Sequence, residues 1–137
     1  MDNIAERAWR AALKLLGIRY RLHGRVPQHG LDCVGLVACA YQDAGLRFKS
    51  LPDDYRLHCD ERLQVAGLLE QSGFDRADEE PIRHGDVALI HVGRGQQHLI
   101  LLSPDAHIHA HAGLRRVVLT PGAPDGDHIG RWRWRNA

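Results

Sequence analysis

The sequence predicts an α+β fold in which N-terminal helices pack against a C-terminal antiparallel sheet. In the first half of the chain, apolar residues recur every three or four positions, as they do in amphipathic helices. After Gly85 the pattern changes to short β-rich runs that are separated by turn residues. Helical segments followed by a series of strands are typical of the α+β class.

The size and composition of the chain indicate one domain, residues 1–137. The 137 residues, of which 44% are hydrophobic, suffice for a single buried core. The formal net charge of +1 comes from scattered charges, with no basic stripe that would attract nucleic acid. We therefore expect no nucleic-acid partner.

The N-terminus and the cysteines bear on the compartment. Residues 1–6 lack the basic and apolar regions of a secretory signal, and no apolar run approaches the roughly 18 residues of a membrane span. Three cysteines, an odd number, do not form a disulfide framework and suit a reducing compartment. The sequence predicts a protein that is cytoplasmic as synthesised, without a signal peptide or a membrane span.

Three helices are expected in the first half of the chain. A polar residue, Asp2 or Asn3, can cap the first helix, and glycines end the first two. Residues 18–31 contain two glycines and a proline and are interpreted as a loop. The expected helices cover residues 4–17, 33–45 and 61–71.

Five strands are expected in the second half. The last one alternates arginine with tryptophan from Arg131 to Arg135, and we interpret it as an edge strand with the tryptophans inward and the arginines outward. The less favoured interpretation is that these tryptophans stack on bases or sugars. The expected strands cover residues 86–90, 98–102, 107–111, 116–119 and 131–135.

The turn formed by residues 103–106 sets the register of a hairpin, because proline stands at its second position. A two-residue loop at this point places His98 opposite His111 and Ile100 opposite His109, all on one face of the sheet. His98 would then lie directly beside His111 and diagonally near His109.

The chemistry of the chain centres on Cys33, which lies where a glycine-bearing loop becomes the second helix. Unpaired N–H groups and the macrodipole at a helix N-terminus stabilise a thiolate, so we expect the pKa of Cys33 to be depressed. Histidines further along the chain supply candidate bases, and cysteine before histidine is the chain order of papain-like hydrolases. Cys39 and Cys59 have no partner at metal-ligand spacing and are interpreted as bystanders.

Five sequence elements stand in a defined order between Tyr20 and Leu119. They are Tyr20 to Gly24, Asp32-Cys33-Val34-Gly35-Leu36-Val37, Gly85-Asp86-Val87, His98 to Leu101 and Ile108-His109-Ala110. Their order and approximate spacing resemble the NlpC family of papain-like cell-wall cysteine peptidases, whose nucleophile motif is Asp-Cys-Ser-Gly-Leu-Val. The resemblance implies a papain-like fold.

The resemblance also implies roles for individual residues. Cys33 would be the nucleophile, His98 the base, and His109 the group that orients the base. Tyr20 and Asp32 would line the substrate pocket, and the chemistry needs no cofactor. Members of this family cleave the peptide stems of bacterial peptidoglycan, typically between D-glutamate and a diamino acid, so peptide stems are the expected partner.

Two departures from the family pattern resemble its phage tail-associated branch. Val34 replaces the usual serine, and a second glycine is missing from the motif that begins at Tyr20. Together with the lack of a signal peptide, these departures imply association with a phage or prophage, with tail proteins as partners and the virion as a location. Val34 also removes a hydroxyl from the pocket, which affects substrate preference.

Alternatives stay open for the site. The hairpin register favours His111 as the third residue, and His91 is an alternative base. Histidines at alternate strand positions can also converge on Zn²⁺ with His98, which would make the protein a zinc-dependent hydrolase. A further class is a catalytically silent tail-assembly or binding module of the same fold.

Overall fold

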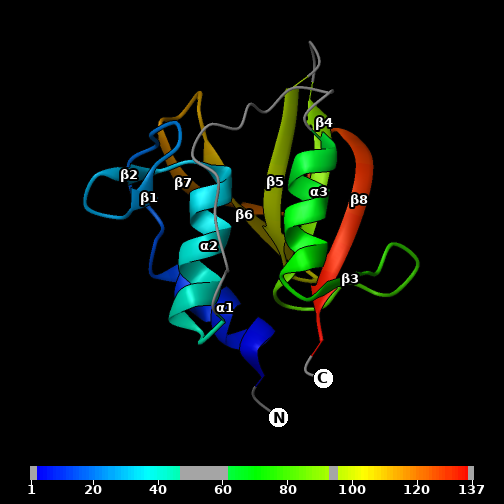
Figure 1. Cartoon of the computed structure of the whole chain (residues 1–137). Helices are drawn as coiled ribbons and strands as arrows, with labels where there is room; N and C mark the ends of the chain where they lie inside the picture. Colours follow the sequence, from blue (N-terminus) through cyan, green and yellow to red (C-terminus); the bar gives the residue numbers. More distant parts are fainter. Residues whose placement is uncertain (1–2, 47–61, 93–95, 136–137) are drawn as a thin grey trace.

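The computed structural model describes residues 3–46, 62–92 and 96–135, in which three helices pack on one side of an antiparallel sheet (Figure 1). This arrangement confirms the predicted fold class. The helices are α1 (Ile4–Leu13), α2 (Cys33–Asp43) and α3 (Arg62–Gln71). The strands are β1 (Arg25–Val26), β2 (Gly30–Leu31), β3 (Phe74–Arg76), β4 (Asp86–Val92), β5 (Gln96–Leu102), β6 (Ala106–His111), β7 (Arg116–Pro121) and β8 (Asp127–Trp134).

The N-terminal helix begins at the predicted cap but ends earlier than predicted. The side chain of Asn3 accepts a hydrogen bond from the backbone N–H of Glu6 at 2.8 Å, which satisfies one of the free donors of the first turn. Helix α1 ends at Leu13, and a turn leads from there to Gly17, whose φ of +88° suits glycine. None of the helices among the described residues has the length and apolar character needed to cross a membrane.

The hairpin between β5 and β6 has the predicted register near its turn. Leu101 pairs with Ile108 and Leu102 with His107, and the N–H of Ser103 donates to the carbonyl of Ala106 at 2.9 Å. Beyond Leu101 the two strands no longer pair with each other, although β5 stays paired with β4 along its whole length. The strands therefore separate toward His98, and the positions directly opposite in the predicted register do not pair there.

The two faces of the sheet have different coverings. Leu99, Leu101, Ile108 and Ala110 lie in the large core that the sheet shares with the helices. The alternate residues Ile100 and Leu102, with Ala88 and Ile90 of β4, form a second, smaller apolar cluster. Because side chains alternate along a strand, the histidines of β5 and β6 belong to the side of this smaller cluster.

The last strand does not lie at the sheet edge as predicted. In the six-stranded order β3-β8-β4-β5-β6-β7, β8 lies between β3 and β4. Its tryptophan Trp132 is fully buried as expected, but Arg131 and Arg133 are also buried, at 9% and 4% exposure. The sequence analysis missed β3 because three residues, Phe74–Arg76, carry too little pattern to predict a strand.

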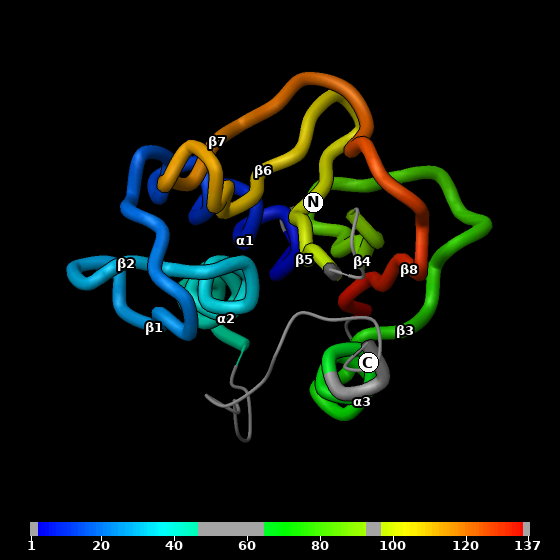
Figure 2. Tube along the Cα trace, turned by 90° about the horizontal axis from the view of Figure 1, so that it is seen from above, coloured from blue at the N-terminus to red at the C-terminus, as the bar shows by residue number. Residues whose placement is uncertain are grey.

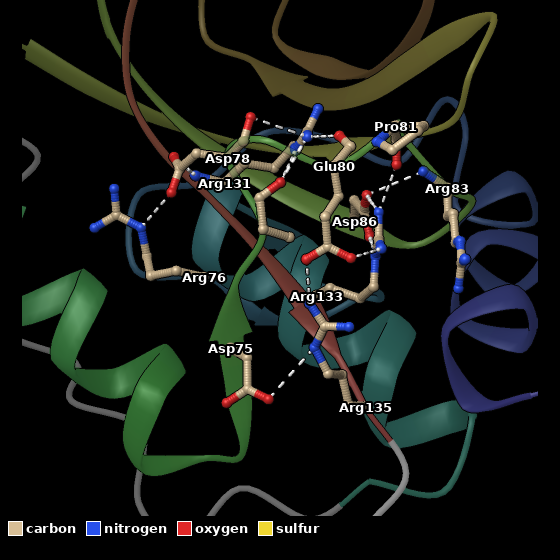
Figure 3. Close-up of polar contacts among 11 residues, drawn as sticks. Asp75, Arg76, Asp78, Glu80, Pro81, Arg83, Asp86, Arg131, Arg133 and Arg135 are labelled. Atoms are coloured by element: carbon tan, nitrogen blue, oxygen red, sulfur yellow. Dashed lines mark hydrogen bonds and ion pairs between the residues drawn. The ribbon is translucent and has the colours of Figure 1, made fainter.

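The buried arginines of β8 are matched by polar groups on the segment that follows β3 and on the first residue of β4 (Figure 3). Nε and Nη2 of Arg133 donate to the two carboxylate oxygens of Asp86, at 2.9 and 2.8 Å. Nη2 also donates to the carbonyl of Pro81, and Nη1 donates to the carboxylate of Glu80. Arg131 donates to the backbone carbonyls of Ala77 and Asp78. These hydrogen-bond partners compensate for the burial of the guanidinium groups of Arg131 and Arg133.

We expect Arg133→Leu to destabilise the protein by about 3–5 kcal/mol, because it leaves the buried carboxylate of Asp86 without its ionic partner. Chemical denaturation measures the loss. The control is Arg135→Leu, which removes an arginine that is 40% exposed and should lower the free energy of unfolding far less. Equal losses in the two variants would contradict the stabilising role of the buried pair.

Candidate active site

The position of Cys33 is fixed by the buried carboxylate of Asp32. One oxygen of Asp32 accepts the N–H of Gly35 at 2.8 Å, which caps α2, and the other accepts the N–H of His23 at 2.8 Å. The guanidinium of Arg25 lies 3.4 Å from the carboxylate. Since Asp32 has no exposed surface, its carboxylate joins the start of α2 to the loop that precedes it.

Close backbone contacts hold the same loop against α2. A Cβ atom on Gly35 would lie 1.9 Å from the carbonyl oxygen of Gly24, and one on Gly24 would lie 2.1 Å from that of Gly30. Any larger residue at Gly35 or Gly24 would force the backbones apart. These two glycines therefore explain the glycine pattern that surrounds the cysteine motif.

Tyr20 lies beside this junction. It forms a bridge with Leu31, two residues before Cys33, and its side chain is partly buried. Burial, together with the nearby groups of Cys33 and Asp32, raises the pKa of Tyr20 to about 12. Tyr20 is therefore a neutral hydroxyl near the thiol, and its role as a pocket residue stays a prediction.

Cys33 is the first residue of α2, and its sulfur lies against strand β5. The backbone N–H groups of Leu99, of Val34 and of Cys33 itself lie near the sulfur. These donors lower the pKa, but burial at 1% exposure and the charge of Asp32 raise it to about 12. The predicted depression of the pKa is therefore wrong for this structure, because burial outweighs the helix N-terminus.

His98 and His109 form a hydrogen-bonded pair. Nε2 of His98 lies 2.9 Å from Nδ1 of His109, and the two rings meet edge to face at 73°. Burial, together with the other histidines nearby, lowers the pKa of His98 to about 4 and that of His109 to about 3. Both rings are therefore neutral at pH 7.

The partner of His98 in this hydrogen bond is His109, its diagonal neighbour in the predicted hairpin. His111 accepts the backbone N–H of Leu114 through its Nδ1 at 3.0 Å, so it is engaged with its own loop. The strands separate before the positions of His98 and His111 could pair, which leaves His109 within reach of His98. The alternative base His91 lies in β4, opposite Gln97.

A third group, Thr120 of β7, contacts the pair. Its hydroxyl oxygen lies 3.3 Å from Nε2 of His109. The sequence analysis missed this residue because it expected the strand to end at Leu119, whereas β7 runs to Pro121. Extending the alternating pattern by one residue would have placed Thr120 near the histidine face.

The hydrogen bonds are consistent with two sets of tautomers, because the hydroxyl of Thr120 can donate or accept. If Nε2 of His98 donates to Nδ1 of His109, then Nε2 of His109 carries a proton and donates it to Thr120, and Nδ1 of His98 is unprotonated. If Nδ1 of His109 donates to Nε2 of His98, then the hydroxyl of Thr120 donates to Nε2 of His109, and Nδ1 of His98 carries the proton. Only the first set leaves Nδ1 of His98 able to accept a proton.

The structure does not join all the predicted residues directly. Tyr20, Asp32 and Cys33 lie together, and His98 and His109 lie together, but no hydrogen bond connects the Cys33 thiol to His98 within the described residues. The histidine pair faces a cavity of about 610 Å³, which is lined by residues of β4 to β7 and the loops that follow them.

The structure also bears on Cys39 and on the predicted zinc site. The thiol of Cys39 donates to the carbonyl of Arg25 at 3.1 Å, while Cys59 lies outside the described residues. Among the residues that the structure describes, no three His, Cys, Asp or Glu side chains are grouped so as to hold a metal ion. The histidine cluster therefore offers no zinc ligand set in this conformation.

A match to a family model identifies the family of this chain. The NlpC/P60 family model matches residues 17–123, a span that contains Tyr20, Cys33, His98 and His109. This chain belongs to the NlpC/P60 family. No curated protein sequence matches it significantly.

Solved structures of NlpC/P60 proteins share the fold at low sequence identity. NlpC2 from Trichomonas vaginalis is similar over 97% of this chain, with a TM-score of 0.69 and 19% identity, and the chain spans 49% of that protein. The NlpC/p60 domain of the peptidoglycan hydrolase SagA has a TM-score of 0.62 and 19% identity, over 85% of this chain and 88% of that domain. RipD from Mycobacterium tuberculosis, a non-catalytic NlpC/p60 domain protein adapted to peptidoglycan binding, has a TM-score of 0.61 and 17% identity, over 96% of this chain and 97% of RipD.

The lowered pKa of His98 predicts a loss of stability in acid. Between the ordinary pKa of 6.5 and the folded value of about 4, the unfolded chain binds a proton that the folded protein does not. Stability is therefore full above pH 6.5 and falls as the pH is lowered, by about 2 kcal/mol at pH 5 for His98 alone. Denaturation of the wild type at a series of pH values should show this loss. His98→Gln should flatten it, the exposed control His29→Gln should not, and equal slopes in all three proteins would refute the assignment.

The charge of Asp32 predicts a second pH effect. Asp32→Asn keeps an oxygen that can cap α2 but removes the negative charge that raises the pKa of Cys33. The pH dependence of iodoacetamide labelling of Cys33, followed by mass spectrometry of the labelled peptide, should shift to lower pH. The control Asp43→Asn, at the exposed far end of α2, should leave the profile in place. A shift of the Asp32→Asn profile to higher pH would contradict the effect.

Proposed function

We propose that this chain is a cysteine peptidase that cleaves the peptide stems of bacterial peptidoglycan. The observation that carries the proposal is the hydrogen bond between His98 and His109, because it joins the predicted base to its predicted orienting group. A thiol, an imidazole and a second group that orients the imidazole are the components of nucleophilic cysteine catalysis. Membership in the NlpC/P60 family, together with the structural similarity to the peptidoglycan hydrolase SagA, supports peptidoglycan as the substrate class.

The proposed reaction requires a rearrangement on substrate binding that brings the Cys33 thiol to Nδ1 of His98, because the two side chains do not meet in the described structure. It then begins with proton transfer from the thiol to this nitrogen, while the sulfur forms a bond to the carbonyl carbon of the scissile amide and the backbone N–H of Cys33 donates to the resulting oxyanion. His98 then protonates the departing amine, which leaves a thioester. A water molecule gives a proton to His98 and attacks the thioester; the carbon–sulfur bond breaks, His98 returns the proton to the sulfur, and the acid product leaves.

The pKa values bear on the timing of the first step. Since burial raises the pKa of Cys33 and lowers that of His98, both groups are neutral in the free protein. In the proposed mechanism the proton moves as the bond to carbon forms, rather than before substrate binds. In the proposed mechanism His109 orients His98, and the hydroxyl of Thr120 contacts the other ring nitrogen of His109.

Tyr20 and Asp32 are proposed to support the substrate site in different ways. Tyr20 is partly exposed beside Cys33 and can contact a bound peptide. Asp32 is completely buried, with both oxygens bound to backbone N–H groups, so it acts through the position of α2. The sequence resemblance to the phage tail-associated branch, based on Val34 and the incomplete tyrosine motif, extends the proposal to a phage or prophage enzyme with tail proteins as partners.

A second candidate function is peptidoglycan binding without cleavage. The observations that favour it are the 1% exposure of Cys33 and the lack of a direct bond between Cys33 and His98. RipD is a non-catalytic protein of the same family with a similar fold. The two functions differ in whether the thiol is needed to release fragments.

Digestion of purified peptidoglycan, with mass analysis of the released fragments, tests the proposal. We expect the wild type to release peptides, and Cys33→Ala to lower the rate at least about a thousandfold because it removes the nucleophile. His109→Ala should lower the rate less than His98→Ala, because it orients the base without accepting the proton. Chelators should have no effect on a reaction that uses thiol and imidazole alone.

Two controls complete the experiment. Cys39→Ala should retain wild-type activity, since that thiol bonds to a loop carbonyl away from the histidines. Binding of the insoluble peptidoglycan, measured by co-sedimentation, is followed in the same samples. Binding without fragment release by the wild type would establish the silent module, and activity that survives in Cys33→Ala would refute the peptidase mechanism.

A further inference from the structure

A second cavity lies next to the candidate active site and is surrounded by arginines. It has a volume of about 600 Å³, and its walls come from two short segments, residues 17–22 and 112–116. Four of the nine residues that line it are the exposed arginines Arg19, Arg21, Arg115 and Arg116. We call it the arginine pocket.

Among the described residues, the charges of the arginine pocket have no acidic counterpart. Its lining contains no acidic residue, and within the described chain none of the four guanidinium groups makes an ion pair or a hydrogen bond. By contrast, every arginine labelled on β3 and β8 in Figure 3 has carboxylate or carbonyl partners. The pocket is therefore a concentration of positive charge that an anion could neutralise.

The backbone holds these charges close together at a cost. Arg19 and Arg116 face each other across a β-bridge, and like charges in that position repel. The N–H of Tyr20 donates to the carbonyl of Arg115 at 2.9 Å, which fixes the two segments. Arg115 has a φ of +60°, a conformation that is unfavourable for a residue with a side chain. Strain and repulsion at one place are typical of a binding site.

The arginine pocket adjoins both halves of the candidate active site. Tyr20 lines the pocket and lies beside Cys33. Ala112 and Leu114 line both the arginine pocket and the cavity that the histidine pair faces. In Figure 2 the segment before β1 runs beside the start of β7, at the same end of the molecule as the start of α2. A ligand in the pocket would therefore lie within a few residues of the thiol and the imidazoles.

We propose that the arginine pocket is an anion subsite that binds a carboxylate of an acidic peptide substrate while a neighbouring amide bond lies at Cys33. Guanidinium groups bind carboxylates through paired, charge-assisted hydrogen bonds, and several arginines in one cavity fit a ligand with one or two carboxylates. This proposal rests on the proposed peptidase function only for its catalytic readout. Binding of the peptide is measured separately, on a protein that cannot cleave it.

The test compares two probes that differ in one charge. One is a short stem peptide with a free glutamyl carboxylate, and the other is the same peptide with that group as a carboxamide. Binding is measured by calorimetry to the Cys33→Ala protein and to the same protein carrying Arg19→Gln and Arg116→Gln. We expect the acid to bind about tenfold more tightly than the amide, and we expect the double arginine substitution to abolish that preference.

A matched control removes two positive charges elsewhere. Arg7→Gln with Lys14→Gln changes exposed residues of α1 and its cap, outside the arginine pocket, and should keep the tenfold preference. With active protein, the pocket variant should raise KM for the acid peptide about tenfold and leave kcat within a factor of two.

The outcomes separate the two proposals. Equal affinity for acid and amide overturns the carboxylate subsite, even if the wild type cleaves both peptides. A preference that survives in the pocket variant also overturns it. Tighter binding of a glycerol phosphate polymer than of the acid peptide would assign the pocket to phosphate instead. A charge preference without any cleavage by the wild type would refute the peptidase and retain the subsite.

Discussion

The buried carboxylate of Asp32 is the constraint on which the candidate site depends. It joins three parts of the chain, because it caps α2 through Gly35, holds the loop at His23 and pairs with Arg25. A carboxylate without exposed surface is tolerated only where such partners replace water. Without these bonds, neither the direction of the first turn of α2 nor the place of the Cys33 sulfur would be fixed.

The same carboxylate opposes ionisation of the thiol that it positions. Its negative charge is the second cause, after burial, of the raised pKa of Cys33. A helix N-terminus usually lowers the pKa of a thiol, whereas the charge of the neighbouring Asp32 raises the pKa of Cys33. Two opposite effects therefore act on the same thiol. The result is a thiol that stays neutral while buried, which protects it from oxidation and alkylation until a base takes its proton. Precise placement and easy ionisation of the thiol are thus in competition at this helix terminus.

The histidine contact could be predicted from the sequence because it depends on local geometry. A proline turn of two central residues fixes the register, and alternation along the strands then puts His98 and His109 on one face. The choice between His109 and His111 could not be made in this way. It depends on where β5 and β6 separate, which the tertiary packing determines rather than the turn.

Features that depend on distant partners were missed. The alternation of arginine and tryptophan in β8 predicted correctly that Trp132 is buried, but Arg133 is buried because Asp86, 47 residues away, supplies a carboxylate in the core. The burial of Cys33 likewise depends on β5, which approaches α2 only in the folded protein. Propensity and periodicity describe neighbours in sequence, so they carry no information on these pairings.

The two groups of arginines show how the surroundings of a charge indicate its role. On β8 the guanidinium groups are paired with carboxylates and carbonyls, and their positions are explained by the stability of the sheet. In the arginine pocket the four guanidinium groups have no partner among the described residues, and Arg115 has a positive φ, so stability does not explain their arrangement. Under our proposal, a carboxylate of the substrate supplies the missing partner. The arginines would then select the substrate, whereas a thiol and two imidazoles could act on any amide.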